Sequence, residues 1–261
     1  MTHIITDIHA HVLPGVDDGP EDLTATQALL ATFHSTGVHR VFCTSHYHSP
    51  YFDVKQSDLE QGFSAVTQAR SSHSLELALG AENRISAEFI ADIQAGTVHT
   101  LGSTNYVLVE FETPKITSQA LDIVYELIVR GYRPIMAHPE RNLALQRKPA
   151  LADTLLDAGL LLQATAVCFQ QAEKHAHQSA KLAWSLLRQG KISVIASDAH
   201  NTTSRPPDLM TAYDNISLQL GSSVAEELMS NANAIWNNEM CEQVKIEGKG
   251  AKRTTRLFRR S

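Results

Sequence analysis

The sequence predicts an α/β barrel in which parallel strands alternate with helices, and three observations lead to that fold class. Short apolar runs alternate along the chain with stretches whose apolar residues recur at helical spacing. Several of these stretches reach a glycine and are followed at once by an apolar run, which is the rhythm of βαβ units in a parallel sheet covered on both faces. The chain has 261 residues and no obvious linker, a length that barrels of this class reach as one domain.

The predicted strands are the short apolar runs at 3–9, 40–45, 75–80, 106–111, 133–138, 160–165 and 192–197. Three amphipathic stretches between them, each containing a glycine that stops the helix, are the clearest predicted helices: 23–37, 118–132 and 177–191. An open, doubly wound sheet is the alternative, but its glycine-rich dinucleotide loop is missing. Seven strands without a linker therefore favour a closed or nearly closed barrel.

Composition bounds the class of protein. Hydrophobic residues make up 43% of the chain and charged residues 19%, as in ordinary globular proteins. No run of 18 apolar residues predicts a transmembrane helix, and the first residues lack the features of a signal peptide. The cysteines are odd in number and have no metal-binding spacing: Cys43, Cys168 and Cys241. We therefore expect a cytoplasmic protein without disulfides.

Charge is distributed unevenly between the body and the C-terminus. The net charge is −6, but residues 245–261 hold seven Lys or Arg and one Glu, so this end carries +6 and the rest −12. An acidic body does not suit nucleic acid, whose phosphates need a basic surface. We predict one catalytic domain over 1–240 and a basic, disordered tail over 241–261. Contact of the tail with anionic lipid or an acidic partner is the alternative.

Polar side chains end six of the seven predicted strands. In chain order they are His9 and His11 with Asp17 and Asp18, then His46, Glu82, Glu110 with Glu112, His138 with Glu140, and Asp198 with His200. Side chains two apart on a strand share a face, and parallel strands bring their C-terminal ends to one rim of a barrel. Mixed imidazole and carboxylate ligands suit Mn, Fe or Zn, and carboxylates can bridge two ions. We expect a site for two or three metal ions.

Each of these residues has a structural alternative when it is taken alone. A lone H-x-H is a weak signal, His46 could be satisfied by backbone, Glu82 and Glu110 could cap helices or lie on the surface, and Asp18 could belong to a turn. Their joint placement at strand ends argues against this, because burying unpaired charges there would be unfavourable without metal. Arg141 and Arg205 follow two of the ligands, and we expect them to bind phosphate, with a structural salt bridge as the alternative.

The motifs as a set resemble those of the PHP (polymerase and histidinol phosphatase) metal-dependent phosphoesterases. They are H-x-H at the start, T-S-H, G-A-E, H-P-E-R, and S-D-A-H followed by R-P-P. DIHAHVLPGVDDGP, HPER and SDAHN…RPP are most similar to the CpsB/CapC family, the bacterial manganese-dependent protein-tyrosine phosphatases of capsule and exopolysaccharide clusters. The resemblance runs from about Ile5 to about Asn237. One position departs: Tyr47 follows His46 where relatives often carry a basic residue.

The resemblance implies a distorted (β/α)7 TIM-like barrel, the PHP fold, with three metal ions at its rim, most often Mn²⁺, with Fe, Co, Zn and Mg as alternatives. It implies catalytic roles for Arg141 and Arg205 together with His46 and His200. It also implies the ligands of each ion: His9, His11, Glu82 and Asp198 for the first; Glu82, Glu110 and His138 for the second; Asp18, His46 and His200 for the third.

The implied reaction is hydrolysis of phosphotyrosine by metal-activated water. The cysteine-based route requires Cys-x5-Arg, which this chain lacks. The implied substrate is the phosphotyrosine tail of a membrane-associated bacterial kinase that controls polysaccharide synthesis, which places the enzyme near the inner membrane face. The alternatives are a PHP phosphoesterase for a small phosphate monoester such as histidinol, sugar or nucleotide phosphate, a metal-dependent amidohydrolase, and a non-enzymatic metal-binding scaffold.

Overall fold

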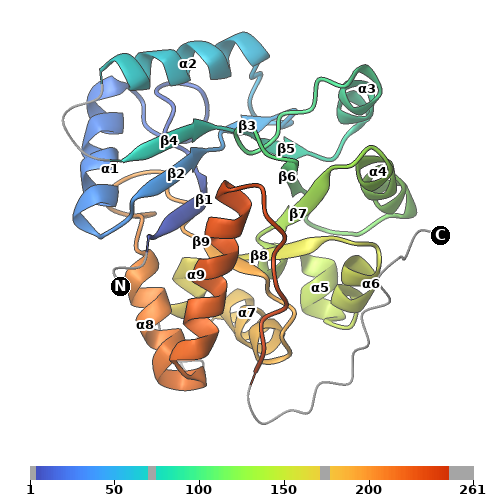
Figure 1. The fold of residues 1–261 in the computed structure, drawn as a ribbon. Helices are drawn as coiled ribbons and strands as arrows, with labels where there is room; N and C mark the ends of the chain where they lie inside the picture. The colour runs from blue at the N-terminus through green and yellow to red at the C-terminus, as the bar shows by residue number, and fades with distance from the viewer. Residues whose placement is uncertain (1–3, 70–74, 171–176, 247–261) are drawn as a thin grey trace.

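Parallel strands form two sheets in the computed structural model, which describes residues 4–69, 75–170 and 177–246 (Figure 1). The first sheet is β1 (Thr6–Ala10), β2 (Arg40–Cys43) and β4 (Glu76–Leu79), in that order. The second is β3 (His46–Tyr47), β5 (Glu82–Arg84), β6 (Tyr106–Glu110), β7 (Arg133–Ala137), β8 (Leu161–Thr165) and β9 (Val194–Ala196). Every strand pair in both sheets is parallel, as the alternation of strands and helices predicts.

The two sheets are arcs of one barrel. β2 passes into β3 and β4 into β5 after a break of two residues, and the Glu82 amide donates to the Ser45 carbonyl oxygen (3.1 Å) across that break. At the other edge Ala10 pairs with Ala199, and the His11 amide donates to the Ala199 carbonyl oxygen at 2.8 Å. Counting β2/β3 and β4/β5 as single strands, seven strand positions follow one another around the barrel. The predicted distorted seven-stranded barrel is confirmed.

Helices surround the strands (Figure 1). They are α1 (Leu23–Ser35), α2 (Gln56–Gln68), α3 (Ala87–Ala95), α4 (Ser118–Val129), α5 (Leu143–Arg147), α6 (Leu151–Asp157), α7 (Gln178–Arg188), α8 (Leu209–Leu220) and α9 (Ser222–Trp236), with 3₁₀ turns η1 (Pro139–Arg141) and η2 (Ala166–Phe169). The three clearest predicted helices are α1, α4 and α7. Gly37 and Gly131, which follow α1 and α4, have φ of 83° and 90°, a region that glycine adopts without strain. None of the described helices is long and apolar enough to cross a membrane.

Side chains fill the barrel interior, so the barrel is not a pore. Ile8, Phe42, Leu108 and Ile135 belong to one inner cluster, which Ile235 of α9 joins. α9 also bonds to the start of β1, where the Thr6 hydroxyl donates to the Asn233 side-chain oxygen at 2.7 Å. α9 therefore covers the N-terminal end of the barrel, and the strand ends predicted to carry ligands lie at the opposite, C-terminal rim.

A bulge in β1 turns two histidines toward that rim. The pairing of β1 with β2 shifts register between Asp7 and Ala10. Ile8 points into the inner cluster, and His9, although it is next in sequence, also points inward, because the bulge adds one residue and reverses the alternation of faces. The Asp7 carboxylate stabilises this local geometry by accepting hydrogen bonds from the amides of His9 (3.2 Å) and Ser197 (3.1 Å).

Residues just beyond 240, within the stretch predicted as a tail, contact the barrel. The Asn231 side chain on α9 bonds both the amide (2.8 Å) and the carbonyl oxygen (2.9 Å) of Glu242. Val244 is buried in the outer core. These contacts hold residues 241–246 against the barrel, while 247–261, where a disordered tail is predicted, lie outside the described residues.

The outer core yields a stability prediction. Leu228 of α9 is 0% exposed and Leu218 of α8 is 84% exposed. We expect Leu228→Ala to lower the free energy of unfolding by about 2–5 kcal/mol, because the change removes buried methyl groups and leaves a cavity. The matched change Leu218→Ala should shift it by less than about 0.5 kcal/mol. Urea unfolding at constant metal content measures both, and equal effects would contradict the burial of Leu228.

Candidate metal centre and active site

The C-terminal rim of the barrel gathers all nine residues predicted as metal ligands into four overlapping clusters: His9, His11, Asp18, His46, Glu82, Glu110, His138, Asp198 and His200. Six of them line a cavity of about 340 Å³ together with both predicted phosphate-binding arginines, Arg141 and Arg205. The residues come from strands and loops far apart in the chain, as expected for a site at the C-terminal ends of barrel strands.

The tightest cluster has the dimensions of a metal site. His9 Nε2 lies 3.2 Å from His11 Nε2, 3.4 Å from Glu82 Oε2 and 3.5 Å from Asp198 Oδ1. His11 Nε2 lies 3.5 Å from the same Glu82 oxygen and 3.6 Å from the same Asp198 oxygen. Four ligands bound tetrahedrally at about 2.1 Å stand about 3.4 Å apart. The donor atoms of His9, His11 and Asp198 therefore form a cluster that fits one divalent ion, and Glu82 adjoins it beside the two histidines.

Glu82 links this cluster to its neighbours. Its Oε1 lies 2.7 Å from His138 Nε2, and its Oε2 lies 3.1 Å from His46 Nδ1. Glu110 lies within metal-ligand reach of Glu82 and His46. A carboxylate with both oxygens facing different imidazoles is suited to bridge two ions.

A further cluster forms on the solvent side around Asp18. Its Oδ1 lies 3.2 Å from His200 Nε2 and 3.6 Å from His46 Nε2. His11 also reaches this cluster, with Nδ1 3.9 Å from the same oxygen. The structure thus brings together the three residues that the resemblance implies for a third ion and adds His11 at their edge.

Hydrogen bonds fix the orientation of three of the imidazoles. The Nδ1 atoms of His9, His11 and His200 donate to Gln163 Oε1 (2.9 Å), Asp17 Oδ2 (2.7 Å) and the Asp198 carbonyl oxygen (2.9 Å). Each Nε2 is then the atom that faces the cluster, which is the arrangement typical of metal-ligating histidines. Among the described residues, His200 Nε2 is buried and makes no hydrogen bond of good geometry, although Asp18 Oδ1 lies 3.2 Å from it. The residues present fit a set of divalent ions.

Three supporting residues were missed by sequence reasoning or given no role. Gln163 lies on β8, the one strand that does not end on His, Asp or Glu, and it orients His9. A polar glutamine inside the apolar run LLLQAT could have indicated this role. Asp17 holds His11 and also accepts from the His46 amide at 2.8 Å. Arg84 pairs with Glu110, Nη1 to Oε2, at 2.8 Å, and no local pattern marked it.

Two buried carboxylates of the cluster, Glu82 and Asp198, have pKa values lowered by their neighbours. Burial by itself would raise the pKa of Glu82, but the nearby imidazoles of His9 and His138 outweigh it and hold that pKa well below its usual range. Burial lowers the pKa of His11, and the Asp17 carboxylate more than reverses this, so the pKa lies well above the usual value. The site therefore attracts positive charge.

Both arginines meet on the outer oxygen of Asp198. Arg205 Nη2 lies 2.7 Å from Asp198 Oδ2 and its Nη1 lies 3.2 Å from Asp18 Oδ2, while Arg141 Nη2 also donates to Asp198 Oδ2. Their side chains remain 40% (Arg141) and 34% (Arg205) exposed and line the cavity. The salt bridge and access to a phosphate thus coexist, because each guanidinium has further donors.

Several strand-end residues lie outside the cavity. Glu112 is exposed and pairs with Lys115 at 3.4 Å. Glu140 is buried and accepts from the Thr165 amide at 3.0 Å, which is a structural role. Tyr47, the departure from the family pattern, packs its ring against His99 at 4.5 Å and does not line the cavity.

Comparison with known proteins agrees with this geometry. Residues 5–237 match the family model described as "Capsular polysaccharide synthesis, CpsB/CapC". Tyrosine-protein phosphatase CpsB of Streptococcus pneumoniae is 30% identical over 228 residues, covering 85% of this chain and 93% of that protein. Putative tyrosine-protein phosphatase CapC of Staphylococcus aureus is 30% identical over 241 residues, covering 90% and 92%.

A solved structure extends the comparison to three dimensions. It is described as belonging to YwqE from Bacillus subtilis and CpsB from Streptococcus pneumoniae, "unique metal-dependent tyrosine phosphatases". It superposes with a TM-score of 0.81 at 26% identity and covers 92% of this chain and 97% of its own. With a family model that spans most of its length and a barrel shared with these relatives, the chain belongs to the CpsB/CapC family.

Proposed function

We propose that this chain is a metal-dependent protein-tyrosine phosphatase that hydrolyses phosphotyrosine with water as the nucleophile. The observation that carries the proposal is the convergence of His9, His11, Glu82 and Asp198 at ligand spacing, directly beside two arginines. Relatives over most of the chain are named tyrosine-protein phosphatases, and the structural relative is described as metal-dependent.

The proposed cofactor is three divalent ions, Mn²⁺ in the first instance, because the donors mix imidazole nitrogen with many carboxylate oxygens. His9, His11, Glu82 and Asp198 would hold the first ion; Glu82, Glu110 and His138 would hold the second; Asp18, His46 and His200 would hold the third. Bound at such a site, divalent ions supply Lewis-acid stabilisation of phosphoryl oxygens and lower the pKa of a water ligand.

The protein side chains bind and orient the phosphate. Arg141 and Arg205 stay charged and offer paired N–H donors that match two phosphate oxygens, so they bind the anion and stabilise the charge that develops on it. His46 and His200 lie on either side of Asp18 and hold the solvent side of the site in place. The leaving group is a phenolate with an ordinary pKa of about 10, which reduces the need for a general acid.

No cysteine is suited to act as the nucleophile. Cys43 and Cys168 are buried among apolar side chains, and burial raises the pKa of both thiols far above the range in which a thiolate forms. Cys241 lies at the opposite end of the barrel, beside Tyr106. We therefore propose water, rather than a thiolate, as the nucleophile.

We further propose the phosphotyrosine tail of a membrane-associated bacterial tyrosine kinase as the physiological substrate, which places the enzyme in the cytoplasm at the inner membrane face. The family description, capsular polysaccharide synthesis, supports a role in capsule or exopolysaccharide production.

Removal of metal tests the reaction. Chelator-stripped protein should not release phosphate from a phosphotyrosine peptide, and added Mn²⁺ should restore release. The rate on phosphotyrosine should exceed that on phosphoserine by roughly tenfold or more, because a phenolate leaves more readily than an alkoxide. Phosphate release is measured with sugar phosphates in parallel. A preference for small phosphates would agree with the proposed metal site but contradict phosphotyrosine as the substrate. No phosphate release with any divalent ion would contradict the proposed reaction.

The support for His11 yields a second prediction. Asp17→Asn weakens the hydrogen bond that orients the imidazole, so we expect metal affinity to fall roughly 10–100-fold with the fold retained. Metal titration by calorimetry and activity against metal concentration measure the change. Asp214→Asn, an exposed change on α8, is the control. Unaltered affinity in the Asp17 variant would show that the orienting bond has no part in metal binding.

Replacement of the cysteines separates the two routes to phosphotyrosine hydrolysis. Alanine at Cys43, Cys168 and Cys241 together should leave kcat unchanged in folded, metal-loaded protein, because water is the nucleophile. Circular dichroism and metal analysis verify the preparation before kinetics. If the folded, loaded variant were inactive, the metal route would be wrong.

A further inference from the structure

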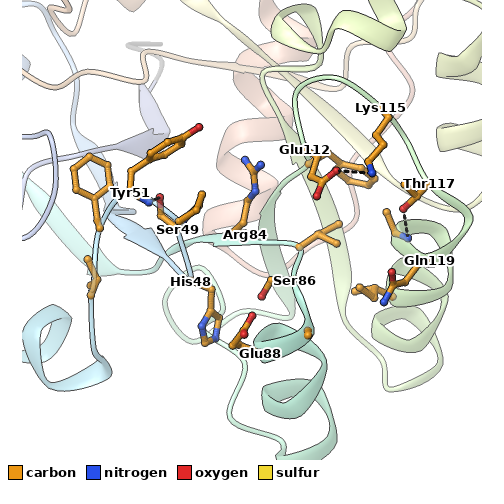
Figure 2. Close-up of a pocket in the computed structure, with 18 of the residues that line it drawn as sticks. His48, Ser49, Tyr51, Arg84, Ser86, Glu88, Glu112, Lys115, Thr117 and Gln119 are labelled. Carbon is orange, nitrogen blue, oxygen red and sulfur yellow. Dashed lines mark hydrogen bonds and ion pairs between the residues drawn. The ribbon is translucent and has the colours of Figure 1, made fainter.

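A second, larger hollow adjoins the cavity that the candidate metal ligands line. Figure 2 shows this hollow. It has a volume of about 890 Å³, against about 340 Å³ for the cavity itself. Ser49 and Tyr51 lie on one side, Lys115 and Gln119 on the other, and Arg84 lies between them (Figure 2). Sites of about 300–1,000 Å³ hold drug-sized ligands, so this groove has room for several residues of a peptide.

The groove and the cavity are continuous. Ser49, Tyr51 and Phe52 line both of them. Arg84 of the groove pairs with Glu110 of the cavity. Tyr51 is 82% exposed at this junction, where its ring can pack against a chain that passes from one hollow into the other. A residue held in the cavity would therefore have its sequence neighbours in the groove.

The lining suits a polypeptide. Phe52, Val54 and Ile85, which are partly exposed, supply apolar surface in the groove. Thr117 and Gln119 at the start of α4 supply neutral hydrogen-bonding groups for a peptide backbone. A small phosphate monoester would fill the cavity and leave this surface unused.

The charges of the groove favour one class of neighbouring residue. Its Arg and Lys are already paired, Arg84 with Glu110 and Lys115 with Glu112. His48, which also lines the groove, is paired with Asp92 at 2.6 Å. Asp53 and Glu88 are exposed lining residues for which the described part of the chain provides no ion pair. An acidic segment would be repelled here, whereas a basic or uncharged one would not.

We infer that this groove binds the polypeptide next to the phosphotyrosine and selects apolar and basic flanking residues over acidic ones. The inference rests on the proposed function and deepens it, because it assigns a binding groove and a preference to the residues that flank the phosphotyrosine.

The test compares kcat/KM of Mn²⁺-loaded protein on three substrates: free phosphotyrosine, a nonapeptide with phosphotyrosine between leucine and lysine residues, and the same peptide with glutamate for lysine. We expect the lysine peptide to exceed free phosphotyrosine by roughly tenfold, the equivalent of one good side-chain contact. It should exceed the glutamate peptide by roughly three- to fivefold, the scale of exposed charge pairs.

Two variants assign these differences to the groove. Gln119→Trp fills it from α4 and should lower the ratio of kcat/KM for the lysine peptide to that for free phosphotyrosine by roughly tenfold. Gln178→Trp, at the exposed start of α7, is the matched control and should not change that ratio. Asp53→Asn with Glu88→Gln should remove the preference for lysine over glutamate, whereas Asp214→Asn with Glu226→Gln should retain it.

The outcomes separate the two proposals. Phosphotyrosine hydrolysis with no peptide preference, or a preference that Gln119→Trp leaves intact, would overturn the groove assignment alone. A glutamate preference in the unaltered protein would overturn its charge selectivity. No hydrolysis of free phosphotyrosine or of either peptide would overturn the proposed function, and the groove assignment with it.

Discussion

The active-site end of the molecule depends on one buried carboxylate. Glu82 is 1% exposed and its two oxygens lie 2.7–3.5 Å from the ring nitrogens of His9, His11, His46 and His138. An ionised carboxylate in the interior is strongly unfavourable without compensating positive charge. These imidazoles come from β1 and the residue after it, from β3, and from the end of β7, so the charge of Glu82 is what makes their convergence favourable.

The barrel adopts unusual backbone geometry to place these groups. His138 and Asp198 have φ of 34° and 55°, a region that non-glycine residues rarely adopt, and each directly follows a strand or lies two residues beyond one. Such residues cost about 1–3 kcal/mol each and persist where the surroundings fix them. The Asp198 amide donates to the His9 carbonyl oxygen at 2.9 Å, so the strained residue is also part of the closure of the barrel. The hydrogen bond that helps to close the barrel between β9 and β1 therefore also fixes the position of Asp198.

Sequence reasoning reached the fold and the cluster because both follow from local patterns. Strand ends in a parallel barrel meet at one rim, so His9, Glu82 and Asp198 could be placed together without coordinates. Arg84 could not be assigned, because its pairing with Glu110 depends on the register of β5 against β6. The contacts of residues 241–246 could not be predicted either, because this segment forms no helix or strand and is held by the burial of Val244 and by hydrogen bonds with Asn231 of α9.

Asp198 links the donor cluster to the two arginines for which we propose phosphate binding. Its Oδ1 faces His9 and His11, whereas its Oδ2 accepts from Arg141 and Arg205. Burial alone would raise the pKa of this carboxyl, but His9 and the arginines outweigh it and hold the pKa far below its usual range. The two oxygens of one buried carboxylate thus contact the donor cluster on one side and the guanidinium groups on the other. Positioning both on a shared anchor keeps a bound phosphate in register with the cluster, because neither can shift without the other.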